Sequence, residues 1–170
     1  MTDVETLFRQ YHGQLVRYLT RRLGDRDWAE EVAQETFVRA LRQTELKNER
    51  AWIFAVATNL VRDEARKDIR RRRHLELLSA EAKAESGDAP PDELERSEER
   101  ALARSALEKL SEKDREALLM KEEGLDYHEI AEALELSVAS VGTTLSRARR
   151  RLVEAYEGLR REEGGGRRTG

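Results

Sequence analysis

The sequence predicts an all-α protein made of two small helical domains joined by a flexible acidic linker, the C-terminal one a helix-turn-helix. Alanine, leucine, arginine and glutamate are abundant and only two of the 170 residues are proline, a composition that favours helix. Apolar residues recur every three or four positions, and no stretch alternates with the period of a strand. Aromatic residues make up 5% of the chain, so we expect two modest cores rather than one large core.

Three helices are expected in an N-terminal domain that spans residues 1–76. Each begins where a polar side chain can accept hydrogen bonds from the first free backbone amides. The expected starts are Thr2 with Glu5, Asp27 with Glu30, and Asn48. The expected apolar stripes are Leu7, Phe8, Tyr11, Leu15 and Leu19 in the first helix, Trp28, Val32, Phe37 and Leu41 in the second, and Trp52, Ile53, Val56 and Leu60 in the third.

A linker at 77–97 is predicted because Pro90 and Pro91 lie among small and polar residues and cannot continue a helix. The second domain is expected at 98–163, followed by a disordered glycine-rich tail at 164–170. Its helices are expected to begin at Ser97, at Ser111 with Asp114, at Asp126 with Glu129, and at Ser137. A short helix, a turn of about three residues and a longer helix form a helix-turn-helix.

Basic residues cluster on both sides of an acidic middle segment. Residues 74–100 carry nine acidic and three basic side chains, whereas arginines gather at 70–73 and 147–151. Two basic clusters suit a chain that touches a polyanion at two places, although solvated helix ends explain the charge alone equally well. The segment 137–151 contains no acidic residue, which favours DNA binding over an ordinary helical hairpin. The residues expected on its outward face are Ser137, Ser140, Thr143, Thr144, Ser146, Arg147 and Arg150.

Several classes of protein are excluded by what the sequence lacks. There are no cysteines, no apolar run of membrane-spanning length and no secretory signal at the start, so we expect a cytoplasmic chain without disulfides or thiolate metal sites. The histidines at 12, 74 and 128 have no metal-ligand spacing, and no phosphate-binding glycine loop is present. No catalytic residue, metal, cofactor, membrane contact or small-molecule substrate is predicted.

Two stretches together resemble the extracytoplasmic-function sigma factors of bacterial RNA polymerase, which belong to the sigma-70 family. The segment 27–40, DWAEEVAQETFVRA, resembles the polymerase-binding helix, and WIFAVATN at 52–59, followed by Asp63 and Arg66, resembles the helix that melts the promoter. ALEKLS at 106–111, DYHEIA at 126–131 and LSRARRRL at 145–152 resemble the helix-turn-helix domain. Both regions, in this order and in so short a chain, form a specific signature.

The resemblance implies a partner and a role for each region. The second helix would bind core RNA polymerase, the third helix with its preceding loop would bind the minus-ten element as single-stranded DNA, and the last helix would read the minus-thirty-five element in the major groove. Phe37 and Trp52 are expected in the core instead. The implied polymerase-binding residues are Glu31, Gln34, Glu35 and Val38. The implied minus-ten residues are Thr44, Lys47, Asn48, Asn59, Arg62, Arg66 and Arg70. For the minus-thirty-five element, Tyr127 joins the outward face given above.

The chain departs from the family at three positions. Members commonly carry a basic residue at the positions of Gly142 and Thr144, and a glycine in the turn at Glu135. Weakened minus-thirty-five recognition and either a different or a strained turn follow from these changes. Two other functions remain open: a DNA-binding regulator that never engages polymerase, and a polymerase-binding protein that reads promoters poorly. The resemblance also allows an anti-sigma factor as a partner, which no residue here identifies.

Overall fold

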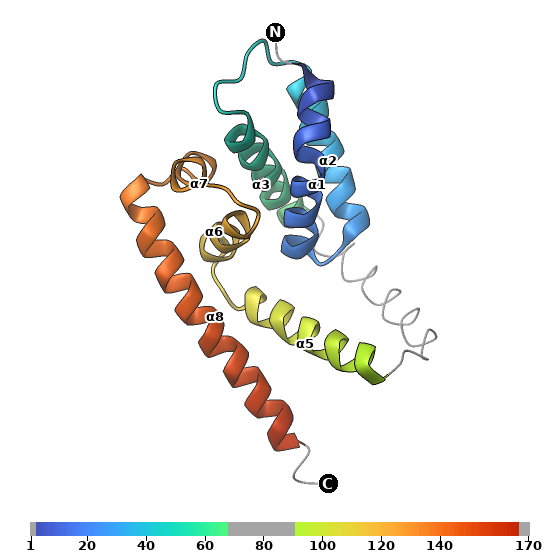
Figure 1. The fold of residues 1–170 in the computed structure, drawn as a ribbon, viewed down its shortest axis with the longest axis vertical. Coiled ribbons are helices and arrows are strands. Elements are labelled where there is room, and N and C mark those ends of the chain that lie inside the picture. Colours follow the sequence, from blue (N-terminus) through green and yellow to red (C-terminus); the bar gives the residue numbers. More distant parts are fainter. Residues whose placement is uncertain (1–2, 68–90, 167–170) are drawn as a thin grey trace.

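The computed structural model describes residues 3–67 and 91–166, and within those ranges the regular elements are all helices (Figure 1). The prediction of an all-α fold is confirmed. The helices are α1 (Val4–Leu23), α2 (Arg26–Ala40), α3 (Glu49–Lys67), α5 (Pro91–Glu108), α6 (Glu112–Glu122), α7 (Tyr127–Leu134) and α8 (Val138–Gly166). Helices α1 to α3 pack on one another as an N-terminal unit, and α5 to α8 form a C-terminal unit.

The core of the N-terminal unit forms where α1, α2 and α3 face each other. Leu15, Phe37 and Phe54 are buried there, and the expectation that Phe37 lies in the core is confirmed. The hydroxyl oxygen of Tyr18 lies 2.7 Å from that of Thr58, and burial raises the pKa of the Tyr18 phenol, which therefore stays neutral. This bond satisfies two polar groups that would otherwise be buried without partners.

Four expectations about the N-terminal unit are wrong in detail. The first helix is capped by Asp3, whose carboxylate accepts from the amide of Glu5 at 3.1 Å, and the second by Asp25, which accepts from the amide of Trp28 at 3.2 Å. The segments before α1 and α2 each contain more than one residue that can cap a helix, so local sequence alone does not decide which of them is the cap. Phe8 was expected in the apolar stripe, but it is 44% exposed because it lies one residue around the helix from buried Leu7. Leu41 was expected in the stripe of the second helix, but it is 67% exposed at the C-terminal end of α2.

The expected caps of the last three helices are confirmed. Ser111 accepts from the amide of Asp114 at 3.3 Å, and Asp126 and Glu129 cap α7 reciprocally. Ser137 accepts from the amide of Ser140 at 3.2 Å and begins α8. The turn between α7 and α8 therefore joins two well-capped helices in a helix-turn-helix.

Other boundaries of the C-terminal unit differ from expectation. Helix α5 begins at Pro91 rather than at Ser97, because proline is tolerated at the first helical position, where no backbone N–H is needed. Helix α8 continues to Gly166, three residues beyond the expected end at 163. Most of the expected linker and residues 167–170 of the expected tail lie outside the described ranges.

The two units lie against each other. Helix α7 packs on α3 and helix α6 on α1, whereas the lower parts of α5 and α8 extend away from the N-terminal unit (Figure 1). The face of α3 that meets α7 and α6 carries residues to which the sequence assigns DNA binding. The arrangement of the units therefore bears directly on the candidate site.

Candidate nucleic-acid interface

Exposed polar side chains run along the first turns of α8. Ser137, Ser140, Thr143, Ser146 and Arg150 follow one another at spacings of three or four residues, and all five are exposed. The hydroxyl oxygens of Ser137 and Ser140 lie 2.6 Å apart, so the first turn presents a fixed pair of hydroxyl groups. Hydroxyls near a helix N-terminus and an arginine further along are groups that contact base edges and phosphates when a helix enters the major groove.

Thr144 is buried against the inner side of α8, so the expectation that it points outward is wrong. It is only 6% exposed and shares the inward stripe of Val141, Leu145 and Ala148, which are completely buried. It follows Val141 by three residues and precedes Ala148 by four, the spacing that keeps side chains on one helix face. The family's basic residue at this position has no counterpart here.

Arg147 is held by a buried carboxylate on α6. One of its guanidinium nitrogens lies 2.8 Å from Asp114, and Arg151 lies 3.2 Å from the other oxygen of the same carboxylate. Burial by itself would raise the pKa of Asp114, but the hydrogen bond from Arg147 and the charges of both arginines hold that pKa below its ordinary value. The Arg147 side chain is 40% exposed, so it ties α8 to α6 and still reaches the surface.

Gly142 leaves room for the ring of Tyr127. A Cβ atom at Gly142 would lie 3.6 Å from Cε2 of that ring, and the ammonium of Lys121 lies 5.8 Å from the ring centre. Tyr127 is 40% exposed at the start of α7. The family's basic position on the recognition helix is thus replaced by an aromatic ring with a cation beside it.

Some of the residues expected to bind the minus-ten element are exposed, and others are held by side chains of the C-terminal unit. Asn59 is exposed on α3, but Arg62, one turn later, donates to Glu116 of α6, with the closest atoms 2.5 Å apart. Thr44 and Lys47 are exposed in the loop before α3. Arg66 belongs to α3, and Arg70 lies outside the described residues.

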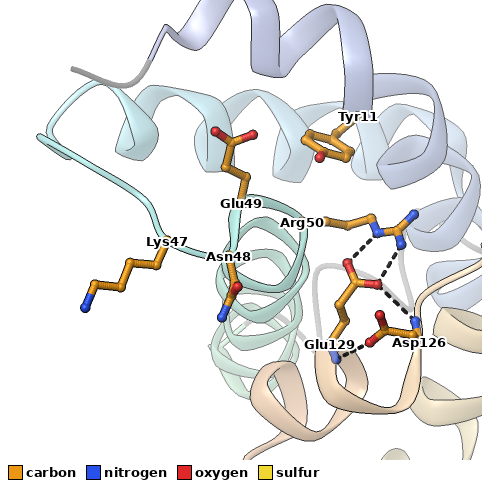
Figure 2. Close-up of a pocket in the computed structure, with 7 residues that line it drawn as sticks. All are labelled: Tyr11, Lys47, Asn48, Glu49, Arg50, Asp126 and Glu129. Atoms are coloured by element: carbon orange, nitrogen blue, oxygen red, sulfur yellow. Dashed lines mark hydrogen bonds and ion pairs between the residues drawn. The ribbon is translucent and has the colours of Figure 1, made fainter.

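A cavity of about 440 Å³ opens beside this loop, between the two units (Figure 2). It is lined by Tyr11, Lys47, Asn48, Glu49, Arg50, Asp126 and Glu129. The side-chain amide nitrogen of Asn48 lies 2.6 Å from the carboxylate of Glu132. Arg50 donates two hydrogen bonds of 2.6 Å to the carboxylate of Glu129. Sequence reasoning missed Arg50; its place as a basic residue directly after the loop was the available signal.

The face of α2 that the sequence assigns to polymerase is exposed. Glu31, Gln34, Glu35 and Val38 all reach the surface, and Glu35 accepts a hydrogen bond from Arg39 at 3.3 Å. Two apolar residues that were expected in the buried stripes are exposed next to this face: Phe8, whose ring centre is 5.2 Å from that of buried Phe37, and Leu41, which is 67% exposed. The spacing of three residues from Val38 to Leu41 was the signal for the second.

Metal and membrane sites are absent from the described ranges. No group of three or more carboxylate or imidazole side chains there could hold a metal ion. In the same ranges, no helix combines the length and the apolar character needed to span a bilayer.

Comparisons with known proteins match both halves of the chain. Residues 7–73 match the family model for sigma-70 region 2, and residues 100–152 that for sigma-70 region 4. The chain is 32% identical to the RNA polymerase sigma factor YlaC of Bacillus subtilis (strain 168), over 95% of this chain and 96% of that protein. It is also 32% identical to the ECF RNA polymerase sigma factor SigL of Mycobacterium tuberculosis (strain H37Rv), over 85% and 81% of the two chains.

A solved structure shares the fold. The sigma factor RpoE of Bartonella quintana, in complex with the anti-sigma factor NepR, superposes with a TM-score of 0.62 over 92% of this chain and 98% of that chain, at 21% identity. The two matched regions and the helix-turn-helix define a promoter-specificity subunit of bacterial RNA polymerase. Since relatives at 32% identity cover most of both chains, this chain belongs to the extracytoplasmic-function (ECF) sigma factors of the sigma-70 family.

Proposed function

We propose that each surface described above serves one step of transcription initiation. The face of α2, with Glu31, Gln34, Glu35 and Val38, docks on core polymerase, and Phe8 and Leu41 add apolar contact at its edge. Helix α3 and the loop before it hold the minus-ten element as a single strand, and α8 reads the minus-thirty-five element as duplex. The protein works in the cytoplasm by binding energy alone, without a catalytic group or cofactor.

The observation that carries this proposal is the exposed face of α8. From Ser137 to Arg150 that face offers hydroxyls and guanidinium groups, and the segment 137–151 contains no carboxylate to repel phosphate. An ordinary surface helix in a chain with 39% charged residues would carry both signs of charge. A polyanion is the partner that such a face fits.

The experiment that tests the proposal is a titration of the full chain into core polymerase that lacks any sigma subunit, followed by transcription from a library of promoter fragments. Tight binding with selective initiation is the expected result. Absence of binding would contradict it and leave a DNA-binding regulator that does not engage polymerase.

A double variant tests the docking surface within that experiment. Changing Gln34→Ala and Glu35→Ala removes two polar contacts from the exposed face of α2, and we expect polymerase affinity to fall about tenfold, or about 1.4 kcal/mol. The matched control, Glu154→Ala with Glu157→Ala, alters two exposed residues of α8 and leaves affinity unchanged. Equal affinities for both variants would remove this face from the proposal.

A second function is favoured by two features of α8. Thr144 is buried and Gly142 has no side chain, so two positions that are basic in the family cannot contact phosphate. A polymerase-binding protein that reads the minus-thirty-five element weakly would show tight binding without selective initiation. We also propose an anti-sigma factor as a partner, because the structurally similar RpoE is bound by one.

A further inference from the structure

The polar contacts between the two units run in one direction. Side chains of α1, α3 and the loop before α3 donate, and carboxylates and backbone carbonyls of α6, α7 and the turn between them accept. The donors are Gln14, Arg17, Asn48, Arg50 and Arg62, and the acceptors are Glu116, the carboxylate and carbonyl oxygens of Glu123, the Gly124 carbonyl, Glu129 and Glu132. We call Glu116, Glu123, Glu129 and Glu132 the acidic face. It presents to the N-terminal unit a row of anionic oxygens, as a nucleic-acid backbone does.

The most buried of these contacts engages a residue of the expected minus-ten surface. The Glu116 side chain is completely buried and receives both Nε and Nη2 of Arg62, at 3.3 and 2.5 Å. Arg22 of α1 lies 3.7 Å from the same carboxylate. Two arginines around one carboxylate make a charge-assisted site of the geometry that also suits a phosphate.

The exposed end of the interface lies at the cavity beside the loop. Figure 2 shows Glu129 of α7 and Asp126, the residue before α7, on the side of the pocket opposite Tyr11, with Arg50 between Tyr11 and these two carboxylates and Lys47 pointing away. Asn48, also expected to contact the minus-ten element, donates to Glu132 next to it. Two of the seven expected minus-ten residues, Asn48 and Arg62, are thus engaged by the acidic face.

We propose that the acidic face mimics the phosphates of single-stranded promoter DNA and competes with that DNA for the same side chains of the N-terminal unit. The inference rests on the proposed minus-ten role of α3. Exchange of a carboxylate for a phosphate keeps a charge-assisted hydrogen bond at each donor, so single-stranded DNA can displace the acidic face. Free sigma factor is therefore self-masked, and separation of the two units exposes the minus-ten surface.

The first arm of the test measures affinity for a fluorescent, random-sequence 20-nucleotide single strand. The variant Glu129→Gln with Glu132→Gln removes two negative charges from the acidic face, and glutamine keeps an oxygen for the cap of α7. The matched control, Glu154→Gln with Glu157→Gln, makes the same change of charge on an exposed part of α8. We expect the first variant to bind about tenfold more tightly than the unmodified chain, and the control to bind within about twofold of it.

The second arm measures the distance between the units without DNA. The sequence has no cysteine, so Gln10→Cys and Arg149→Cys, both exposed, accept a donor and acceptor dye specifically. Energy transfer between the dyes should fall in the Glu129→Gln, Glu132→Gln background and again when the single strand is added. Unchanged transfer, with equal affinities in all three proteins, would overturn the inference.

The two arms separate this inference from the proposed function. If the three proteins bind DNA equally and Asn59→Ala weakens all of them, the minus-ten role of α3 stands and the masking role of the acidic face is overturned. If none of them binds the single strand in isolation or within the polymerase complex, the proposed minus-ten role itself fails, and with it the competition.

Discussion

At the scale of single residues, the backbone of Glu135 holds a conformation that the sequence alone left open. Glu135, in the turn between α7 and α8, adopts φ 55° and ψ 46°, and Leu136 donates its amide to the carbonyl of Ala131 at 2.8 Å. The backbone therefore keeps the left-handed turn that glycine usually makes, and the glutamate is strained in it. Of the two outcomes expected from the missing glycine, tolerated strain is the one observed.

Glu135→Gly should stabilise the protein. Relief of the left-handed strain outweighs the added freedom of the unfolded chain, for a net gain of about 0.5–1 kcal/mol and a rise in Tm of about 2–4 °C. Thermal unfolding measures the effect, and Glu154→Gly in the middle of α8 is the matched control, with an expected loss of about 1 kcal/mol. A lower Tm for both variants would contradict the prediction.

Asp114 gives the protein a pH-dependent component of stability. Its pKa is lower in the folded protein than the ordinary value of 3.8, so its ion pairs stabilise the fold above that pH and are lost as pH falls through the folded pKa. We expect Asp114→Asn to lower the free energy of unfolding by about 2 kcal/mol at neutral pH. Urea unfolding should show this difference shrinking as the pH falls below 3.8 and through the lower pKa of the folded protein. A difference that is the same at every pH would contradict the assignment.

At the scale of elements, α8 separates core packing from its proposed DNA contacts. One face packs through Val141, Leu145 and Ala148, and the other carries the exposed hydroxyls and Arg150. Residues 143 and 144 are adjacent threonines, one exposed and one buried, because successive helical residues point about 100° apart. They provide a matched pair within a single helix.

Thr143→Val should weaken binding to minus-thirty-five duplex about fivefold, because an exposed hydroxyl that contacts DNA is lost at a cost of about 1 kcal/mol. Thr144→Val should leave DNA affinity unchanged, since that side chain cannot reach the groove. Fluorescence anisotropy with a duplex selected from the promoter library measures both. Equal losses in the two variants would place Thr144 at the DNA after all.

Elements were predictable where local signals were unique. Ser111, the Asp126–Glu129 capping box and Ser137 each stood alone before an apolar stripe, and each begins a helix as expected. The starts of α1 and α2 offered neighbouring polar residues of similar capping strength, and the start of α5 depended on whether Pro91 closes a linker or opens a helix. Those choices are made by tertiary packing, which local sequence does not contain.

At the scale of the whole molecule, the arrangement of the units is the feature that sequence could not supply. Arg50 and Glu129 are separated by 79 residues, and Arg62 and Glu116 by 54, so neither pair leaves a local pattern. The sequence did mark Asn48 and Arg62 as polar surface residues, and the fold determines what they meet. The interface is rich in charges, which is typical of interfaces between units that can move relative to one another.

Ionic strength should control this arrangement. Raising salt from about 0.05 M to about 1 M shortens the Debye length to about 3 Å and weakens the partly exposed pairs of the acidic face. Small-angle X-ray scattering of the free chain should then show a larger radius of gyration. The Glu129→Gln, Glu132→Gln variant should already be expanded at low salt and change less. A radius that does not respond to salt in the unmodified chain would contradict a charge-held interface.

Helix α6 physically links the two surfaces that are proposed to read DNA. Asp114 holds Arg147 of the recognition helix, and Glu116, two residues later, holds Arg62 of the minus-ten surface. Residues two apart on a helix point in different directions, so the short helix α6 contacts α8 on one side and α3 on another. A phosphate that binds Arg147 or Arg62 would break one of the two ion pairs of α6. Binding of one promoter element would therefore weaken the contact of α6 with the surface for the other element.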